Sequence, residues 1–457
     1  MATFQIKSAG VATTGSTGAD IFAFANSAGP KNTVLGLAGN DTITLAATVS
    51  GVVNLSVDAG GGADALSLGN TGHALSGATV KGGAGGDVIN FDASALTAST
   101  LNGGDGNDTI TFSGITEKSK VTLGGGADSI IVSAGGLAFA SSTLAGGSGN
   151  DTITFSAVGS LVSSQILGGG GADAITISAA AATTTTGLSI NGDSNVNGGG
   201  NDTITMSTVT GASVEIKGKG GKDSINLFTV AGTGSQVLGN AGADVIVVSG
   251  KVNGSGNLIG GGSGNDTITV SALSANNSVL GGGGADSITL TGAAVNSGVV
   301  NAGAGKDTVS IGTIFSGTLA IGALTDSTLT KLDTFQSTTN NVQGTGLNFT
   351  LSAVTTTTPS TGVAGGADFS GATIYSDGTL DSSDFVTAGN VTARAAIIDA
   401  QGGGANTVFV FEAENDNYLF IQGGAAGTAD DYVARIGTGT RTVSGLSLVM
   451  AAGSITV

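Results

Sequence analysis

One pattern constrains the fold of this chain more than any other feature. A glycine-rich turn that ends in aspartate recurs at intervals of roughly 20 to 23 residues through about the first 300 residues. Its clearest copies are GGDGNDTITF at 103–112, GGSGNDTITF at 146–155, GGSGNDTITV at 261–270 and GGGGADSITL at 281–290. A fixed period in this range is typical of a solenoid, in which each repeat buries its apolar face only by stacking on its neighbours.

The residues after each aspartate predict a strand. The second and fourth of them are apolar, as at Ile110 and Phe112, and those between are mostly Thr or Ser. Alternation with period two and β-branched side chains indicates a half-buried strand. A second apolar patch, such as 278–280, precedes each turn. We therefore expect an all-β fold, a parallel β-helix (β-solenoid) of about fourteen coils of roughly 21 to 22 residues.

The period fails near residue 329, and the composition then changes. We expect the β-solenoid to span 1–330, a Thr-rich transition or linker to span 331–362, and a small C-terminal β domain or cap to span 363–457. Segments 407–411, 417–422 and 431–436 have the composition of strands. Such a domain would cover the last coil, whose edge is otherwise open.

Charge and composition exclude several classes. The net charge of −18 argues against a nucleic-acid partner, and the lack of a long apolar run argues against membrane insertion. No cysteine is present, which excludes disulfides and thiolate metal sites. The carboxylates belong to a repeating column and form no isolated acid–base pair, so we do not expect an enzyme. No cleavable secretory signal is visible at the start.

The turns have the chemistry of a calcium site. Glycine at the first, second and fourth positions permits positive φ, which can direct carbonyl oxygens toward a common centre. Carbonyl oxygens together with a carboxylate are ligands that calcium prefers. The alternative is that each aspartate accepts hydrogen bonds from the amides of its own turn, as in an Asx-turn.

The candidate calcium ligands fall into two groups. Six turns carry the complete pattern and give the stronger candidates: Asp87, Asp108, Asp151, Asp173, Asp266 and Asp286, with Gly104, Gly106, Gly147, Gly149, Gly262 and Gly264. Turns that depart from the pattern give the weaker candidates: Asp20, Asp41, Asp64, Asp128, Asp202, Asp223, Asp244 and Asp307. Lys222 and Lys306 directly precede two of these, where a lysine could replace a cation.

These turns resemble the calcium-binding repeats-in-toxin (RTX) family, whose repeat reads GGxGxD followed by a strand. The resemblance implies calcium held by glycine carbonyls and by these aspartates, with folding completed by the ion. This chain differs in having one motif per coil, which places all sites along one edge. The stretch 416–436 also resembles the C-terminal regions of repeat proteins exported by type I secretion, which implies an extracellular location.

Together these features predict an extracellular structural protein, stabilised by calcium, that assembles into a surface layer (S-layer), fibre or matrix. The expected partners are further copies of the chain, in an oligomer, lattice or filament, and a cell-surface component or glycan. A virion protein, as a fibre or capsid decoration, is an alternative. An adhesin or ice-binding protein is another, suggested by outward threonines at Thr42, Thr44, Thr109, Thr111, Thr152, Thr154, Thr203, Thr205, Thr267 and Thr269.

Overall fold

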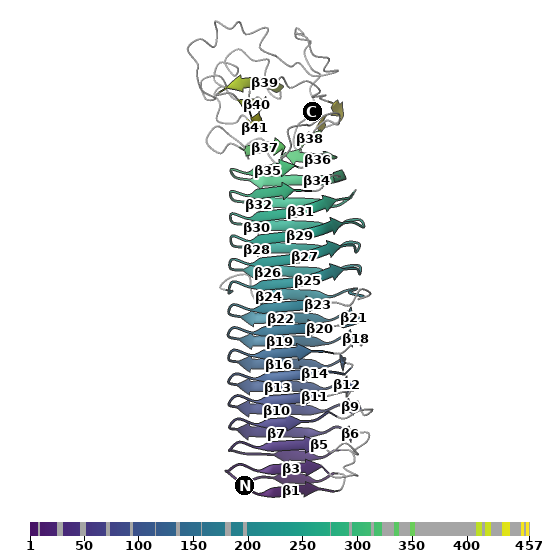
Figure 1. Ribbon diagram of the computed structural model, residues 1–457, viewed down its shortest axis with the longest axis vertical. Coiled ribbons are helices and arrows are strands. Elements are labelled where there is room, and N and C mark those ends of the chain that lie inside the picture. Colours follow the sequence, from purple (N-terminus) through teal and green to yellow (C-terminus); the bar gives the residue numbers. More distant parts are fainter. Residues whose placement is uncertain are drawn as a thin grey trace, which may run out of the picture. The chain divides into compact units, whose positions relative to one another are not determined.

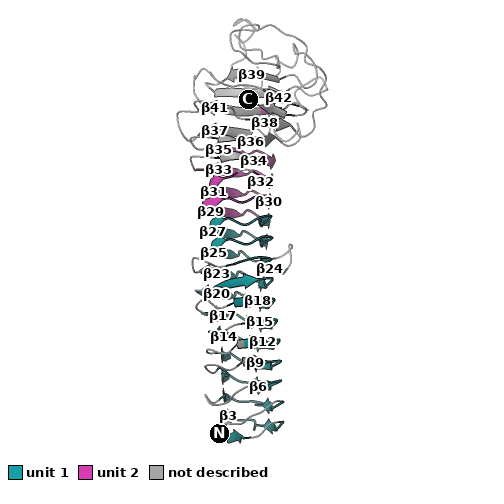
Figure 2. Cartoon of the chain, turned by 90° about the vertical axis from the view of Figure 1, so that its right-hand side faces the viewer, with its two compact units in different colours: residues 1–241 teal, residues 242–457 magenta. Residues whose placement is uncertain are grey.

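The computed structural model describes residues 1–321 except 8–9, 25–30, 46–51, 70–73, 92–94, 115, 134–137, 157, 179–183, 195–198, 275, 292–294 and 312–314. Beyond residue 321 it describes seven strands, given below. The chain divides into two compact units, 1–241 and 242–457 (Figure 2).

Unit 1 is a parallel β-solenoid, as the repeat predicts (Figure 1). Each strand that follows the aspartate of a glycine-rich turn pairs in parallel with the corresponding strand of the next coil, and these strands form sheet A. Sheet A comprises β1 (Thr3–Ile6), β3 (Ile21–Phe24), β5 (Thr42–Leu45), β8 (Ala65–Ser67), β11 (Val88–Phe91), β14 (Thr109–Phe112), β17 (Ser129–Val132), β20 (Thr152–Ser156), β23 (Ala174–Ser178), β25 (Thr203–Val209) and β27 (Ser224–Val230).

The second strand of each coil runs into the glycine turn and belongs to sheet B. Sheet B comprises β2 (Ala12–Thr14), β4 (Thr33–Leu35), β7 (Ser56–Gly61), β10 (Thr79–Ala84), β13 (Thr100–Asp105), β16 (Lys120–Gly125), β19 (Thr143–Ser148), β22 (Gln165–Gly170), β24 (Ser189–Asp193), β26 (Glu215–Gly220) and β28 (Gln236–Ala241).

Some coils contain a third strand that the sequence did not predict. These short strands stack as sheet C: β6 (Val52–Val53), β9 (Ala74–Ser76), β12 (Ala95–Thr97), β15 (Thr116–Glu117), β18 (Ala138–Ala140) and β21 (Ser160–Val162). Figure 2 shows several of them one above another. Two to three residues are too few to display an alternation, which is why the sequence pattern did not reveal these strands.

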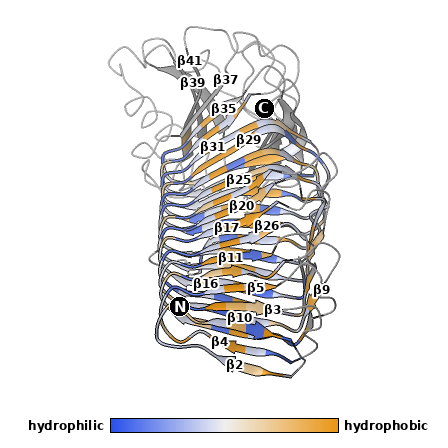
Figure 3. Cartoon of the chain, turned by 60° about the horizontal axis from the view of Figure 1, so that its bottom comes forward, coloured by the Kyte–Doolittle hydropathy of each residue, from blue (hydrophilic) through white to orange (hydrophobic). Residues whose placement is uncertain are grey.

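The core of unit 1 is a set of ladders of like residues. Ile89, Ile110 and Ile130 occupy the same register position in successive coils and are fully buried. The rings of Phe91 and Phe112 stack with centroids 5.5 Å apart. Figure 3 shows apolar stretches recurring along strand after strand. In-register stacking thus lets each coil bury the face that it cannot bury alone.

Unit 2 repeats the same arrangement in its described solenoid residues. Its sheet-A-type strands are β29 (Val245–Val252), β31 (Thr267–Leu273), β33 (Ser287–Leu290) and β35 (Thr308–Ile311), and its sheet-B-type strands are β30 (Leu258–Ser263), β32 (Ser278–Gly283), β34 (Val295–Ala304) and β36 (Phe315–Ile321). Neighbouring strands pair in parallel. The prediction of a parallel β-solenoid is therefore confirmed in each unit.

The described C-terminal strands include both parallel and antiparallel pairs, and the predicted C-terminal domain 363–457 stays a prediction. The strands are β37 (Asp333–Ser337), β38 (Asn348–Leu351), β39 (Val408–Ala413), β40 (Asp416–Ile421), β41 (Tyr432–Thr438), β42 (Val449–Ala451) and β43 (Ser454–Thr456), of which β39, β40 and β41 form an antiparallel set. Most of the predicted linker 331–362 lies outside the described residues. The described residues include no helix that is long and apolar enough to span a membrane.

Candidate metal-binding site

The fourteen aspartates that close the turns form a buried column at one corner of the coils in each unit, with ten of them in unit 1 and four in unit 2. Each is at most 3% exposed. Each directly precedes the first residue of a sheet-A-type strand, and because neighbouring side chains in an extended chain point to opposite sides, the aspartate points inward where that residue points outward. We call this column the aspartate ladder, and the sequence did not predict that its carboxylates lie inside the coils.

One oxygen of each carboxylate ties two coils together. The backbone N–H of Asp87 donates to Oδ1 of Asp108 at 2.8 Å, and that of Asp108 donates to Oδ1 of Asp128 at 2.7 Å. The same bond, at 2.6–2.9 Å, recurs through unit 1 and again within unit 2. The alternative of a hydrogen-bonded aspartate is therefore correct in that a backbone amide donates to each carboxylate. It is wrong about the donor, which belongs to the preceding coil and not to the aspartate's own turn.

The second oxygen has no hydrogen-bond partner in most of the ladder. Oδ2 is buried and accepts no hydrogen bond in ten coils: those of Asp41, Asp64, Asp87, Asp108, Asp128, Asp151, Asp173, Asp202, Asp266 and Asp286. A buried polar atom without a partner is unfavourable, and a buried charge is more so. A proton or a cation at Oδ2 would remove this penalty.

Backbone carbonyls lie close to these unpartnered oxygens. If Gly82 had a Cβ, that atom would lie 2.3 Å from Oδ2 of Asp87 and 2.5 Å from the carbonyl oxygen of Gly103 in the next coil. A Cβ on Gly103 would likewise lie 2.4 Å from Oδ2 of Asp108 and 2.6 Å from the carbonyl oxygen of Leu123. Carboxylate and carbonyl oxygens from consecutive coils therefore converge at this corner.

The candidate glycines at the second and fourth positions are needed for stacking. Gly104 and Gly106 have φ of 124° and 125°, and a Cβ on either would lie 1.7 or 2.2 Å from a carbonyl oxygen of the preceding coil. Gly147, Gly149, Gly262 and Gly264 also have positive φ. First-position glycines such as Gly103 do not, so the prediction of positive φ there was wrong, and Ala59 and Leu123 fill that position in other coils.

Burial raises the pKa of ladder carboxyls above the usual value for aspartate. Desolvation is the largest cause, the bond from the preceding amide opposes it, and neighbouring carboxylates add to it in several coils. The pKa rises to about 6 for Asp151 and Asp223, to about 7 for Asp108, Asp173 and Asp286, and to about 8 for Asp202.

The first turn is satisfied without an ion. Asp20 accepts from the N–H and hydroxyl of Ser16 at Oδ2 and from the N–H of Ala2 at Oδ1. These bonds lower the pKa of Asp20, with the backbone N–H of Ser16 as the largest cause. The hydrogen-bonded alternative therefore describes this turn.

The two lysines beside the ladder do not enter it. Lys222 and Lys306 are exposed, whereas Asp223 and Asp307 directly after them are buried. The two ion pairs found among the described residues are Lys81–Asp58 and Lys217–Glu215, both on sheet B. The exposure of both lysines does not support the idea that a lysine replaces a cation in the ladder, which stays a prediction.

Asp193 is a buried acid that the sequence reading missed. It lies in the long interval between Asp173 and Asp202, at a position that pairs with Gly169 of the preceding coil. Its Oδ1 accepts from the N–H of Gly200 at 3.1 Å. Its charge contributes to the high pKa of Asp202. The irregular interval was the signal that could have identified it.

A second buried polar column lies at another corner of unit 1, one residue before each sheet B strand. The hydroxyl oxygens of Ser119 and Ser142 accept the backbone N–H of Ser99 and Ser119, at 3.2 and 3.1 Å. Each hydroxyl also donates to the carbonyl two residues earlier in its own coil, as Ser119 does to Glu117 at 3.0 Å. We call this the serine column: Ser99, Ser119, Ser142, Ser164 and Ser235, with Asn32 in the same role.

The aspartate ladder fits calcium in its donor chemistry. It offers oxygen donors alone, and ten carboxylate oxygens there have no partner. Each coil supplies one ladder carboxylate, to which Asp193 adds a second in the coil of Asp202, and the described residues hold no group of three or more acidic, His or Cys side chains that could bind a metal. Backbone carbonyls would therefore have to supply most ligands of any ion.

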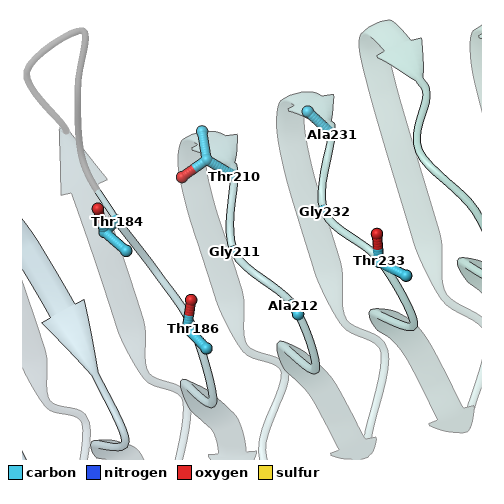
Figure 4. A pocket seen from close by; sticks show the side chains of 8 residues that line it. All are labelled: Thr184, Thr186, Thr210, Gly211, Ala212, Ala231, Gly232 and Thr233. Carbon is cyan, nitrogen blue, oxygen red and sulfur yellow. The ribbon is translucent and has the colours of Figure 1, made fainter.

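A shallow groove of about 520 Å³ lies on three successive coils of unit 1 (Figure 4). Gly211 and Gly232 let the backbones of these coils approach closely, since a Cβ on Gly232 would lie 1.8 Å from the carbonyl oxygen of Gly211. It is lined by Thr184, Thr186, Thr210, Gly211, Ala212, Ala231, Gly232 and Thr233. None of these side chains can act as a general acid or base, or supply a carboxylate or imidazole to a metal.

The predicted outward threonine columns are present on sheet A. Thr109 and Thr111 pair in register with Ser129 and Ile131, and these with Thr152 and Thr154. All of these side chains face away from the core.

No protein-family model and no curated protein matches this chain. A solved structure that resembles it is described as a hyperactive, Ca2+-dependent, beta-helical antifreeze protein from an Antarctic bacterium. The two chains are 21% identical, the match covers 74% of this chain and 83% of the other, and the TM-score is 0.40. Similarity at this level does not carry a function over to this chain.

Proposed function

We propose that this chain is an extracellular structural protein, a calcium-stabilised β-solenoid that assembles into a surface layer, fibre or matrix and catalyses no reaction. The observation that carries the proposal is the aspartate ladder, in which ten buried Oδ2 atoms have no hydrogen-bond partner. Calcium held there would neutralise the carboxylates and link consecutive coils.

The residues of the ladder have distinct roles in this proposal. Oδ1 of each aspartate holds the amide of the preceding coil with or without an ion. Oδ2 and the carbonyl of the first turn residue in the next coil, such as Gly103 for Asp87, would be calcium ligands. One ladder carboxylate per coil makes each site weak, which favours surroundings where free calcium is abundant.

Calcium titration of the purified chain tests this proposal. After chelation at neutral pH, we expect calcium to increase the β signal in circular dichroism and to raise Tm, with magnesium much less effective because it requires a smaller, more regular octahedral site. In calcium, electron microscopy should show ordered assemblies. If neither the spectrum nor Tm responds to calcium, the proposal is wrong.

The proposed surface protein and the virion alternative differ in whether the C-terminal segment is an export signal. A secreted surface protein needs an export signal, which we place in the segment from 408 onward, whereas a virion protein does not. Deletion of that segment should abolish secretion from a host with type I export and leave the intracellular level unchanged. A chain that such a host does not release, with or without that segment, would favour the alternative.

A further inference from the structure

The outward face of sheet A in unit 1, from β3 to β27, carries no charged side chain. Two outward positions in each strand from β3 to β27 form two columns in continuous register. The columns contain Ile21, Ala23, Thr42, Thr44, Ala65, Ser67, Val88, Asn90, Thr109, Thr111, Ser129, Ile131, Thr152, Thr154, Ala174, Thr176, Thr203, Thr205, Ser224 and Asn226. We call this surface the uncharged face.

The outward positions of sheet B, which has the same geometry, do carry charge. Asp58, Lys81, Lys120, Glu215 and Lys217 lie there. Lys81 lies 3.9 Å from Asp58, and Lys217 lies 3.0 Å from Glu215. Strand propensity alone therefore does not explain an uncharged surface, because both sheets need β-forming residues and only one excludes charge.

Exposed apolar side chains also lie on the uncharged face. Val88 is 43% exposed and Ile131 is 37% exposed, and both point outward among small residues such as Ala65 and Ser129. Phe228, two residues before the end of β27 in the same sheet, is 60% exposed. Exposed apolar groups on a flat, regular surface are typical of a surface that another molecule covers.

We propose that the uncharged face is the surface through which two copies of this chain associate, sheet against sheet. This inference rests on the proposed structural role and names its partner as a second copy. The net charge of −18 makes other surfaces of two copies repel, whereas this face brings no charge of its own into contact. Two such sheets pack about 10 Å apart with their side chains interdigitated, as in a β-sandwich.

The area of the uncharged face indicates how strongly two copies should associate. Strands spaced by about 4.8 Å, with four residues of about 3.3 Å each, give an area of roughly 600 Å² from β3 to β27. Burial of both copies removes about 1,200 Å² from water, which is the lower end for a specific interface. We therefore expect a weak pairwise association that becomes evident at high protein concentration.

The test places lysine on one sheet or the other. Thr111→Lys with Thr154→Lys puts two charges in the centre of the uncharged face, flanking Ile131. Gln165→Lys with Ser189→Lys puts the same two charges on outward positions of sheet B. Both variants lower the net negative charge by the same amount, so a change in the overall repulsion between two copies affects the association of both variants equally.

Sedimentation equilibrium of the full chain in calcium, across a range of concentrations, measures the association. We expect the unmodified chain and the sheet B variant to associate alike, and the variant of the uncharged face to need at least about tenfold more protein, because a buried lysine without a partner is costly. An unmodified chain that stays monomeric, or equal association of the two variants, overturns the inference.

Two further readouts on the same samples separate the possible causes. Melting with and without calcium reports the proposed function, so a calcium response without association overturns this inference alone, and association without a calcium response overturns the role of the ion alone. Thermal hysteresis of a monomeric chain, abolished by the face variant, would assign the face to ice and overturn self-association.

Discussion

The two buried polar columns of unit 1 perform the same task with different chemistry. In the aspartate ladder and in the serine column, a side-chain oxygen accepts the backbone N–H of the preceding coil. A serine also has a proton to donate, and Ser119 gives it to the carbonyl of Glu117. An ionised aspartate has none, and its Oδ2 remains without a hydrogen bond in most of the ladder.

The columns also differ in how strictly their residue type is kept. The serine column is interrupted by Leu55, Ala78, Leu188 and Val214, all buried. The ladder has aspartate in all fourteen coils, although asparagine could make the same Oδ1 bond and add a donor, as Asn277 does in unit 2. A hydrogen bond between coils therefore explains why serine occurs in the serine column. It does not explain why the ladder has aspartate and not asparagine, whereas binding of a cation by the carboxylates would.

The largest expected effect comes from the glycine turn that borders the ladder. Gly149→Ala would place a Cβ 1.8 Å from the carbonyl oxygen of Gly126 at a φ of 119°, so we expect a loss of about 3 kcal/mol or more in unfolding free energy. Gly170→Ala is the matched control, because nothing lies within 4 Å of its Cβ. Equal melting temperatures for the two variants would contradict this account of the turn.

The ladder alone should make stability depend on pH. Eleven of its carboxyls have a pKa in the folded chain that is raised above the unfolded value near 3.8, to about 7 for Asp108 and Asp173 and to about 8 for Asp202. The folded chain then binds more protons than the unfolded chain between about pH 4 and pH 8. In chelator, Tm should fall as pH rises through this window, and calcium should reduce the fall because it replaces the proton.

A pH series of melting curves, with chelator and with calcium, checks this prediction. Ser119→Ala leaves the ladder intact and should show the same slope as the unmodified chain. A chelated chain whose Tm stays constant between pH 4 and pH 8 would mean that the carboxyls are not raised in pKa.

Loss of a serine should have a smaller effect that calcium does not change. Ser119→Ala leaves the buried amide of Ser99 without an acceptor, which costs about 1 to 2 kcal/mol. Thermal melting with calcium and with chelator should give the same difference from the unmodified chain. A difference that vanishes in calcium would show that the two columns are not independent.

The smallest effect should come from the exposed bond beside the ladder. Asn107 accepts the N–H of Ala127 at 2.9 Å through its side chain. Since water can replace this acceptor, Asn107→Ala should cost less than about 0.5 kcal/mol in the same melting experiment. A larger loss would indicate that the asparagines stabilise the turns more than their exposure suggests.

The sequence predicted the features that depend on spacing alone. The period identified the solenoid, and alternation after each aspartate identified sheet A with Ile110 and Phe112 inward. It could not show that the carboxylates bind the amide of the preceding coil, because that contact joins residues some twenty positions apart. The serines at 99, 119, 142 and 164 recur with the same period and could have revealed the second column.

The difference between the two columns can be tested by replacing ladder aspartates with asparagine, which, like serine, is neutral and has a proton to donate. Asp128→Asn, Asp151→Asn and Asp173→Asn together keep each Oδ1 as an acceptor and replace each Oδ2 by a donor. For the unmodified chain, each site should add about 1.4 kcal/mol when calcium is at ten times its Kd.

The measurement is the calcium-induced rise in Tm at pH 8 for the unmodified chain and for this triple variant. The account predicts a clear rise for the unmodified chain, and a smaller rise for the triple variant, which should also be at least as stable as the unmodified chain in chelator. An equal rise in both, or none in the unmodified chain, would contradict the claim that the second carboxylate oxygens are there for a cation.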